Sequence, residues 1–330
     1  MMKNKTEPPR KDGESMRIAM TGVSSYLAQV LLPLFESDPD VEEIIGVDIK
    51  APGPEFKKVR FVRRDVRDPG LFREFAGADT LIHLAFIVMP LRDMAEATSI
   101  NIQGSINAFE AAAKAGISKI VQASSIAAYG AWPDNPDFIT EETPVRGMPE
   151  FYYSWTKAEV EKYLDKFQKE HPEIIITRLR PCIFVGPKIN NLFRKIANQR
   201  FFFRFSGMES RVQLVWDEDV AQAFYKVTKE NLPGAFNIAG DNPLNVNDIA
   251  GLVGLRAIKI PFSWAKAFTK AGWALHISTM LSPGWLDVAQ YPIVVDCSKA
   301  KTILGWKPRY DTAGAMLKLL EYKEQLKEDL

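Results

Sequence analysis

Short apolar runs rich in β-branched residues alternate with longer stretches of helical spacing along the first half of the chain. The runs that we expect to form strands lie at 18–21, 43–47, 60–63, 80–84, 119–123 and 174–179. Helices are expected between them, through Leu31 and over 94–115 and 150–169. Gly116 stands where a C-cap glycine would close the helix over 94–115. The pattern predicts an α/β fold with a Rossmann-type, doubly wound parallel sheet.

The alternation stops after the Gly-Pro pair at 186–187, and loops with Pro, Gly and aromatic residues become frequent. We therefore expect a Rossmann domain over 16–185 and a smaller, substrate-binding C-terminal lobe over 186–330. Residues 212–240 again contain strand and helix patterns, so we expect them to return to the Rossmann sheet and interlace the two parts. Residues 1–15 are charged and lack an apolar run, which predicts a flexible tail and not a signal peptide.

The composition argues against two broad classes of protein. The chain has 330 residues, with 42 Lys and Arg against 41 Asp and Glu, whereas nucleic-acid-binding proteins usually carry an excess of basic residues. Its two cysteines, Cys182 and Cys297, are too few for a disulfide scaffold, and neither has a partner at metal-ligand spacing. We therefore expect a cytoplasmic protein with a small-molecule substrate, no nucleic-acid partner and no bound metal.

The most apolar stretch of the second half, 262–281, is interrupted by two lysines and a histidine. It therefore fails as a membrane-spanning helix, and an amphipathic helix that covers a pocket suits it better. Trp264, Phe268 and nearby aromatic residues would then wall a pocket for a fairly apolar substrate, although interior packing is the simpler interpretation. On either interpretation we expect no membrane partner.

A candidate cofactor turn follows the first expected strand, in the sequence TGVSSYLA at 21–28. Gly22 can make the tight turn, while Ser25 and Ala28 stand where a GxxGxxG pattern has its other glycines. Asp48 closes the second expected strand, where a carboxylate can accept hydrogen bonds from the ribose hydroxyls of an adenosine. Because a carboxylate there repels a 2′-phosphate, the pattern favours NAD over NADP. The simpler alternative is a strand-end turn and a surface Asp.

A second group of polar residues has the spacing of a proton-transfer site. Tyr153 and Lys157 share one face of an expected helix, and Ser125 stands at the end of an expected strand. A phenol has a reference pKa of about 10, but an ammonium about 4 Å away would favour phenolate by about 4 kcal/mol, or roughly three pKa units. We therefore expect Lys157 to bring the pKa of Tyr153 near 7, so that the phenol exchanges a proton with a substrate oxygen that Ser125 also holds. A solvated helix face would also explain the Tyr-Lys pair.

Together these motifs resemble those of the extended short-chain dehydrogenase/reductases, also called the NAD-dependent epimerase/dehydratase family. The resemblance spans nearly the whole chain and depends on the order of its motifs. They are TGxxSxxA at 21–28, Asp48, Asp65-Val66, His83-Leu84-Ala85, Asn101, Ser124-Ser125 with Tyr129-Gly130, Tyr153 with Lys157, Leu179-Arg180-Pro181, Val185-Gly186-Pro187, 217–221, 296–300 and Leu304-Gly305-Trp306. The resemblance implies NAD as cofactor and hydride transfer at a secondary alcohol or ketone carbon.

The resemblance also implies roles for individual residues. Tyr153 would be the catalytic acid/base, Ser125 would hold the substrate oxygen, and Asn101 would support the proton relay. Lys157 would be catalytic and would also bind the nicotinamide ribose. The cofactor would contact Thr21, Gly22, Ser25, Tyr26, Leu27, Asp48, Asp65, Val66, Leu84, Ala85, Phe86, Asn101, Tyr153, Lys157, Pro181 and Ile183. A homodimer formed through the two long helices is expected from the same family.

Four positions bear on the reaction and the substrate. Sugar-nucleotide dehydratases of the family carry Asp-Glu directly after the catalytic hydroxyl, whereas Ile126 and Ala127 follow here and cannot transfer a proton. Many sugar-nucleotide epimerases of the family have Asn where this chain has Ile183, which weakens the case for a nucleotide sugar. Arg211 is a candidate to bind a substrate phosphate or carboxylate, and equally a candidate for a surface ion pair.

Three hypotheses remain. The first is an NAD-dependent epimerase of a sugar nucleotide or dehydrogenase of a small alcohol. The second is an NAD(H)-dependent ketone reductase of a hydroxysteroid- or flavonol-like apolar substrate. The third is a dinucleotide-binding sensor that performs no chemistry, which the presence of both Tyr153 and Lys157 disfavours. Retained NAD would favour the epimerase, and exchangeable NAD(H) would favour a dehydrogenase or reductase.

Overall fold

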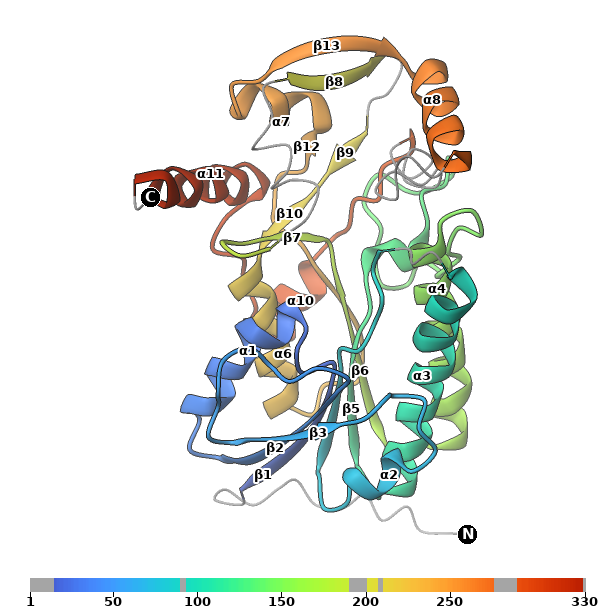
Figure 1. Cartoon of the computed structure of the whole chain (residues 1–330), viewed down its shortest axis with the longest axis vertical. Coiled ribbons are helices and arrows are strands. Elements are labelled where there is room, and N and C mark those ends of the chain that lie inside the picture. The colour runs from blue at the N-terminus through green and yellow to red at the C-terminus, as the bar shows by residue number, and fades with distance from the viewer. Residues whose placement is uncertain (1–14, 90–92, 190–200, 207–209, 276–289, 329–330) are drawn as a thin grey trace.

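Seven parallel strands form one sheet in the order β11-β6-β5-β4-β1-β2-β3 (Figure 1). The computed structural model describes residues 15–89, 93–189, 201–206, 210–275 and 290–328. The strands of the sheet are β1 (Met16–Thr21), β2 (Val41–Asp48), β3 (Val59–Arg63), β4 (Thr80–His83), β5 (Lys119–Ala123), β6 (Ile175–Pro181) and β11 (Gly234–Ile238). The order runs outwards from β1 in both directions, so the expected doubly wound, Rossmann-type fold is confirmed. The crevice of such a sheet lies at the carboxyl ends of β1 and β4, where the order reverses.

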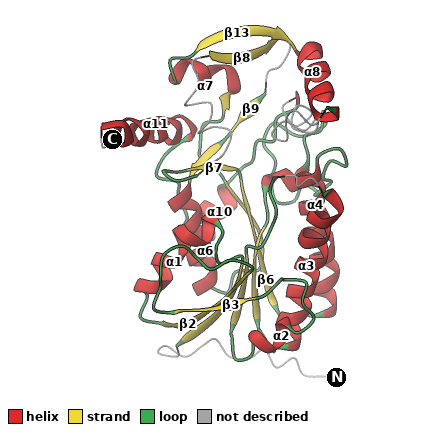
Figure 2. Ribbon diagram, in the orientation of Figure 1, coloured by secondary structure: helices red, strands yellow, loops and turns green. Residues whose placement is uncertain are grey.

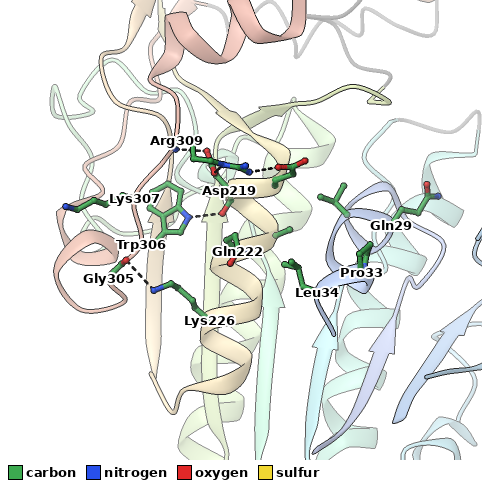
Figure 3. Close-up of a pocket in the computed structure, with 13 residues that line it drawn as sticks. Gln29, Pro33, Leu34, Asp219, Gln222, Lys226, Gly305, Trp306, Lys307 and Arg309 are labelled. Carbon is green, nitrogen blue, oxygen red and sulfur yellow. Dashed lines mark hydrogen bonds and ion pairs between the residues drawn. The ribbon is translucent and has the colours of Figure 1, made fainter. Parts of the chain in front are cut away.

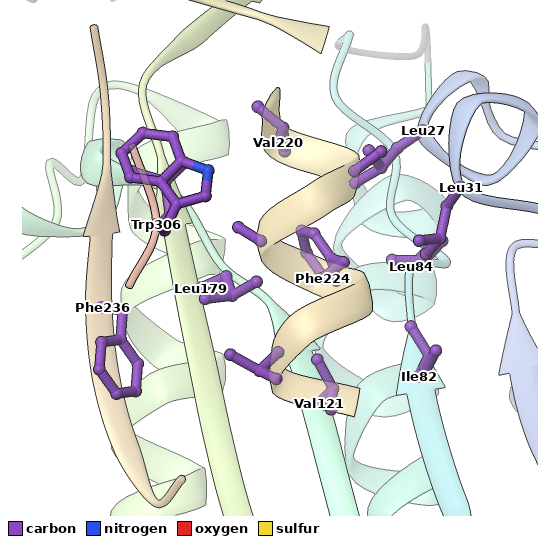
Figure 4. Close-up of a cluster of buried hydrophobic side chains, with 14 of the residues drawn as sticks. Leu27, Leu31, Ile82, Leu84, Val121, Leu179, Val220, Phe224, Phe236 and Trp306 are labelled. Atoms are coloured by element: carbon purple, nitrogen blue, oxygen red, sulfur yellow. The ribbon is translucent and has the colours of Figure 1, made fainter. Parts of the chain in front are cut away.

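Helices cover both faces of the sheet (Figure 2). They are α1 (Tyr26–Ser37), α2 (Leu71–Glu74), α3 (Met94–Lys114), α4 (Tyr152–Glu170), α6 (Asp217–Lys229) and α10 (Ser298–Thr302). One apolar cluster joins α1 and α6 to the first face, and another joins α2, α3 and α4 to the second. Figure 4 shows Leu31 of α1 and Phe224 of α6 in the first cluster, together with Ile82 and Val121 of the strands.

Neighbouring side chains of the central strands divide between these two clusters. In β1, Ile18 and Met20 belong to the cluster with α1 and α6, whereas Ala19 belongs to the other. In β4, Ile82 and Leu81 divide in the same way. Strand side chains alternate between faces, so a strand covered on both sides is apolar at successive positions. This alternation explains why brief apolar runs indicate the strands in the sequence.

Two elements extend beyond their expected ends. The helix α1 continues past Leu31 and through Pro33 to Ser37, because Leu32 and Phe35 are fully buried and their packing offsets the hydrogen bond that Pro33 cannot donate. The strand β6 continues past residue 179 to its last residue, a proline, because its carboxyl end pairs with β11.

After β6 the chain builds a smaller lobe from short paired strands. β7 (Ile183–Val185) pairs with β10 (Leu214–Trp216), β9 (Arg211–Val212) with β12 (Leu244–Asn245), and β8 (Phe201–Ser206) with β13 (Arg256–Pro261). Among the described residues of this lobe, the helices are α7 (Val246–Leu252), α8 (Phe262–Ala274) and α11 (Thr312–Glu328). Within 212–240, β10 pairs outside the central sheet, whereas α6 packs against α1 and β11 pairs with β6.

Gly116 provides a test of the local backbone, because it follows α3 in a left-handed conformation with φ of +81°. We expect Gly116→Ala to lower the free energy of unfolding by about 1 kcal/mol, since a Cβ strains this conformation. Urea denaturation followed by circular dichroism measures the change. Gly53→Ala is the matched control, because both glycines have open space around an added Cβ but Gly53 lies outside the left-handed region. Equal losses in the two variants would contradict the prediction.

Candidate active site

Polar residues collect at the carboxyl ends of the central strands. Thr21 ends β1, Asp48 ends β2 and His83 ends β4. Ser124 and Ser125 follow directly after β5. Because the strands are parallel, all of these residues lie at one edge of the sheet, where open α/β sheets bind their ligands.

The turn after β1 lies tightly against the segment that follows β4. Gly22 adopts a φ of +72°. A Cβ on Gly22 would lie 2.5 Å from the nitrogen of Ala85 and 2.7 Å from the carbonyl carbon of Leu84, so only glycine fits. Ser25 caps α1, and its hydroxyl accepts the amide of Ala28 at 3.3 Å. The turn therefore brings the positive end of the α1 dipole to the crevice.

Asp48 lies beside this turn. Its Oδ2 accepts the amide of Ser24 at 3.0 Å and the hydroxyl of Ser24 at 2.7 Å. Its Oδ1 accepts the amide of Ile49 at 2.7 Å. The carboxylate thus braces the turn through Ser24, a contact that the sequence analysis missed because the direction of a side chain is not visible in a sequence pattern.

Ser125 and Tyr153 meet at the end of β5. Ser125 is buried and caps the short helix η1 (Ile126–Tyr129), where its hydroxyl accepts a backbone N–H at 3.1 Å. The same hydroxyl donates to the carbonyl oxygen of Pro181 at 3.4 Å, and Ser125 lies close enough to Tyr153 to act on the pKa of its phenol. The Tyr153 ring packs edge-on against Phe86, with ring centroids 5.8 Å apart. The structure therefore brings together two of the expected catalytic side chains.

Lys157 lies one helical turn after Tyr153 on α4. Its Nζ donates to the carbonyl of Ala123 at 2.6 Å and lies 3.5 Å from the centroid of the Phe86 ring. The centroid of the Tyr153 ring is farther away, at 5.8 Å. Burial lowers the pKa of Lys157 to about 7, although the charge of Glu161 opposes this effect. The lysine therefore titrates near neutral pH.

The pKa of Tyr153 differs from the expectation of a value near 7. Burial raises the pKa of Tyr153 above its usual value, and the hydrogen bond with Ser125 opposes part of that rise. The expectation considered the attraction between an ammonium and a phenolate, but not the loss of hydration that penalises both charged groups in a buried site. Tyr153 is therefore a neutral phenol at pH 7, next to a lysine whose pKa is lowered to about 7.

Asn101 is buried in α3 and binds a residue that the sequence analysis missed. Its Nδ2 donates to the hydroxyl of Tyr152 at 2.6 Å and to the carbonyl of Ile87 at 3.0 Å, and its Oδ1 accepts the amide of Ile87 at 2.7 Å. Tyr152 precedes Tyr153, and the rotation of about 100° per helical residue turns the two rings in different directions. These contacts position the segment after β4, and a relay role for Asn101 stays a prediction.

His83 is buried between β1 and α3 and has partners for both ring nitrogens. Nδ1 lies 2.6 Å from Oγ1 of Thr21, and Nε2 lies 2.9 Å from Oγ of Ser105. Burial, helped by the charge of Lys157, lowers the pKa of His83 to about 3. His83 is therefore a neutral core histidine with both ring nitrogens satisfied, and the bond to Thr21 ties the ends of β1 and β4 together.

The other residues expected to contact a cofactor come from several elements of the fold. Asp65 follows β3, and its carboxylate accepts a hydrogen bond from the guanidinium of Arg67 at 2.7 Å. This hydrogen bond holds the pKa of Asp65 below its usual range. Leu27 and Val66 are buried. Tyr26 donates a hydrogen bond to the carboxylate of Asp217. Pro181 ends β6 and Ile183 begins β7, so the two residues flank Cys182. Leu84 and Ala85 face the glycine turn, as described above.

Arg211, the candidate substrate residue, lies on β9 and pairs with an acid. Its Nη2 lies 3.2 Å from Oδ1 of Asp137 and 3.3 Å from the carbonyl oxygen of the same residue. The guanidinium also lies 5.8 Å from the centroid of the Phe138 ring. Of the two alternatives for Arg211, these contacts correspond to the surface ion pair.

Two aromatic residues of 262–281 differ from the interior packing that was the simpler expectation. Trp264 and Phe268 lie on α8 and are exposed. Trp285 lies outside the described residues, as does 276–281. The sequence pattern identifies the apolar face of the helix, but only the packing of the lobe decides which way that face points.

A groove of about 720 Å³ lies between α1 and α6 (Figure 3). Its wall includes Pro33 and Leu34 of α1 and the indole of Trp306, whose Nε1 donates to the carbonyl of Asp219 at 2.7 Å. Arg309 donates to the Asp219 carboxylate at 2.7 Å. The side chains of Ser125, Tyr153 and Lys157 do not line this groove, which is therefore separate from the candidate active site.

A buried ion pair lies beneath the candidate active site. Arg180 of β6 donates to both carboxylate oxygens of Glu161, at 2.8 and 2.6 Å. The hydroxyl of Ser124 donates to the same carboxylate at 2.5 Å, and Arg180 also donates to the hydroxyl of Tyr129 at 2.7 Å. Burial acts to raise the pKa of Glu161, but Arg180 holds this pKa below its usual value. Glu161 lies one turn after Lys157, so this pair fixes α4 against the sheet.

Comparison with known proteins gives three kinds of match. A model of the NAD-dependent epimerase/dehydratase family matches residues 18–239. An uncharacterized protein of Mycobacterium tuberculosis is 24% identical over an alignment of 307 residues that covers 90% of this chain and 81% of that protein. A UDP-glucose 4-epimerase of Mycolicibacterium smegmatis is 26% identical over 337 residues, covering 93% of this chain and 98% of that enzyme. The solved structure of the Bordetella bronchiseptica enzyme WbmG in complex with NAD and UDP is similar in fold, with a TM-score of 0.73, 21% identity and 95% coverage of both chains.

The buried ion pair provides a stability test. We expect Glu161→Gln to lower the free energy of unfolding by about 3 kcal/mol, because it leaves the charge of Arg180 buried without its partner. Urea denaturation measures this loss. Glu159→Gln is the control on the same helix, since its partner Lys162 is half exposed and such a pair contributes about 0.5 kcal/mol or less. Similar losses in both variants would contradict a special role for the buried pair.

The lowered pKa of Lys157 predicts a pH dependence of stability. Between about pH 7 and the unfolded value near 10.5, the unfolded chain holds a proton on Lys157 that the folded chain lacks. Folding is therefore penalised at pH 7, and the penalty disappears as the pH rises. Relative to Lys157→Met, the wild-type protein should gain up to about 4 kcal/mol of stability between pH 7 and pH 10.

Urea denaturation of both proteins at the two pH values measures this difference. Lys162→Met is the control, because Lys162 is half exposed on the same helix and should show no such dependence. A stability difference between wild type and Lys157→Met that stays constant with pH would contradict the prediction.

Proposed function

The chain belongs to the NAD-dependent epimerase/dehydratase family, and from this premise we propose that it transfers a hydride at a secondary alcohol or ketone carbon of a small substrate. The family consists of NAD-dependent enzymes. The observation that carries the proposal is the gathering of Ser125, Tyr153 and Lys157 at the carboxyl end of β5. The glycine turn stands at the same edge of the sheet, so a cofactor and a proton donor can share one crevice.

The glycine turn fits a dinucleotide. Gly22 leaves no room for a Cβ next to Ala85, and the positive end of the α1 dipole attracts phosphate oxygens. The carboxylate of Asp48, held beside the turn by Ser24, suits ribose hydroxyls and would repel a 2′-phosphate. We therefore propose NAD rather than NADP. When bound, NAD accepts and returns the hydride.

Tyr153 is the group that we propose to move the proton. Its raised pKa keeps the phenol protonated at pH 7, which suits donation to a carbonyl oxygen held by the hydroxyl of Ser125. The phenolate that results is stabilised by a charged Lys157, whose pKa near 7 allows it to take up a proton as the phenol loses one. In the opposite direction the phenolate accepts the proton of an alcohol.

We propose a sugar carrying a secondary hydroxyl as the first substrate class. The relative from Mycolicibacterium smegmatis, which aligns with 93% of this chain, is a UDP-glucose 4-epimerase. Dehydration is disfavoured because Ile126 and Ala127, both buried in η1, have no group that could eliminate water. An apolar ketone is the alternative substrate class, and assays with added alcohols and ketones test it.

The fate of NAD distinguishes the two forms of the proposal. We would denature the purified protein, measure released NAD by mass and absorbance, and incubate the native protein with UDP-glucose while following its conversion by NMR. Stoichiometric NAD with formation of the C4 epimer supports an epimerase. A protein that binds NADH reversibly and oxidises or reduces added alcohols and ketones supports a dehydrogenase. A protein that binds NAD but converts none of these compounds supports the sensor hypothesis.

Tyr153→Phe tests the proposed acid/base. It removes one hydroxyl and should lower kcat by about 10² to 10⁴-fold, the usual range for the loss of a general acid/base, while NAD binding remains. The rate is measured with whichever substrate the first assays identify. Tyr163→Phe is the matched control, because Tyr163 lies on the same helix and its hydroxyl binds the exposed Glu110. An unchanged rate in Tyr153→Phe would remove Tyr153 from the mechanism.

A further inference from the structure

The helix α8 turns an apolar face towards solvent. Trp264 and Phe268 are 62% and 70% exposed, and Leu275, directly after the helix, is 68% exposed. Ala267 and Ala271 lie between them and are also exposed. Residues three, four and seven positions apart share one side of a helix, so these five residues form a continuous stripe, which we call the α8 face. An amphipathic helix of a globular protein normally buries such a stripe.

The α8 face lies in a basic and acid-free part of the chain. Residues 249–275 contain four Lys and Arg and no Asp or Glu, although the whole chain has nearly equal numbers of both signs. Arg256 and Lys259 lie on β13 and are exposed, as is Lys270 on α8. Figure 1 shows α8 next to β8 and β13, at the opposite end of the molecule from α2. Exposed basic residues therefore lie both on α8 and on the neighbouring strand β13.

We propose that the α8 face binds the surface of an anionic phospholipid membrane. An interfacial helix of this type places Trp, Phe and Leu among the acyl chains near the headgroups and keeps its lysines at the phosphate level. Basic residues near the surface add attraction to anionic headgroups. Within the described ranges, no helix has the length and apolarity needed to cross a bilayer. That finding does not concern a helix that lies on the surface, so this proposal revises the expectation of no membrane partner.

A second copy of this chain is the main alternative occupant of the α8 face. In a two-fold contact each copy presents the same patch to the other, so Lys259 and Lys270 would meet the same charges across the interface. An anionic surface has the complementary charge, and for this reason the observations favour the membrane. The proposal does not depend on the proposed function, because binding to vesicles is measured without turnover.

The test is sedimentation of the full-length protein with vesicles. We expect it to bind vesicles of phosphatidylcholine containing phosphatidylglycerol at low salt, and to bind pure phosphatidylcholine at least about tenfold more weakly. High salt should weaken the binding, because it screens the attraction. A protein that remains in the supernatant with anionic vesicles, or that binds both vesicle types equally, overturns the proposal.

Variants locate the binding surface. The double variant Trp264→Ser/Phe268→Ser should lose about tenfold or more in affinity for anionic vesicles. Ile303→Ser is the matched control, since Ile303 is also exposed, at 54%, but lies outside α8, and it should bind like wild type. A double variant that binds like wild type overturns the proposal. So does one that changes the oligomer mass in light scattering without losing vesicle binding.

A charge variant keeps the proposal testable if the double variant fails to fold. Lys259→Gln/Lys270→Gln changes only exposed side chains and should keep the circular dichroism spectrum of the wild type. We expect it to bind anionic vesicles about tenfold or more weakly. Unchanged binding of this variant would contradict the role of the basic residues and would overturn the proposal.

Discussion

The buried ion pair between Glu161 and Arg180 holds the helix that carries Tyr153 and Lys157 against the sheet. An isolated charge at this depth would be strongly unfavourable, so α4 and β6 are stable only in the register that brings the two residues together. The hydroxyl of Ser124 donates a hydrogen bond to the same carboxylate, and this bond holds the end of β5 next to α4. The geometry of the candidate active site therefore depends on an electrostatic contact that lies one helical turn away from it.

Burial controls the chemistry of the site as much as proximity does. Lys157 and Tyr153 lose hydration together, so the lysine titrates near pH 7 and the phenol stays protonated. The phenol therefore holds its proton more tightly than the neighbouring lysine does. Asn101 and Tyr152 contribute at a different point, because they position the segment that follows β4 and leads to Phe86, the ring that both Tyr153 and Lys157 contact.

The C-terminal lobe has a different physical character from the central sheet. Its strands pair two by two instead of forming one sheet, and part of its apolar surface faces solvent on α8. In the central sheet, helices on both faces enclose the apolar side chains. The lobe thus supplies surfaces for contact with other molecules, whereas the sheet supplies the rigid frame.

The sequence by itself determined the central sheet, because strands covered on both faces need apolar side chains at successive positions, and such runs are visible in a one-dimensional pattern. It also indicated Gly22, Ser125, Tyr153 and Lys157, since turn geometry and helix spacing are local properties. Only the tertiary structure decided the pairing of Glu161 with Arg180, the binding of Asn101 to Tyr152 and the raised pKa of Tyr153. Each of these depends on side chains from distant segments or on the depth of burial. The exposure of Trp264 and Phe268 also depends on the tertiary structure, because periodicity shows that a helix has an apolar face but not whether another element covers that face.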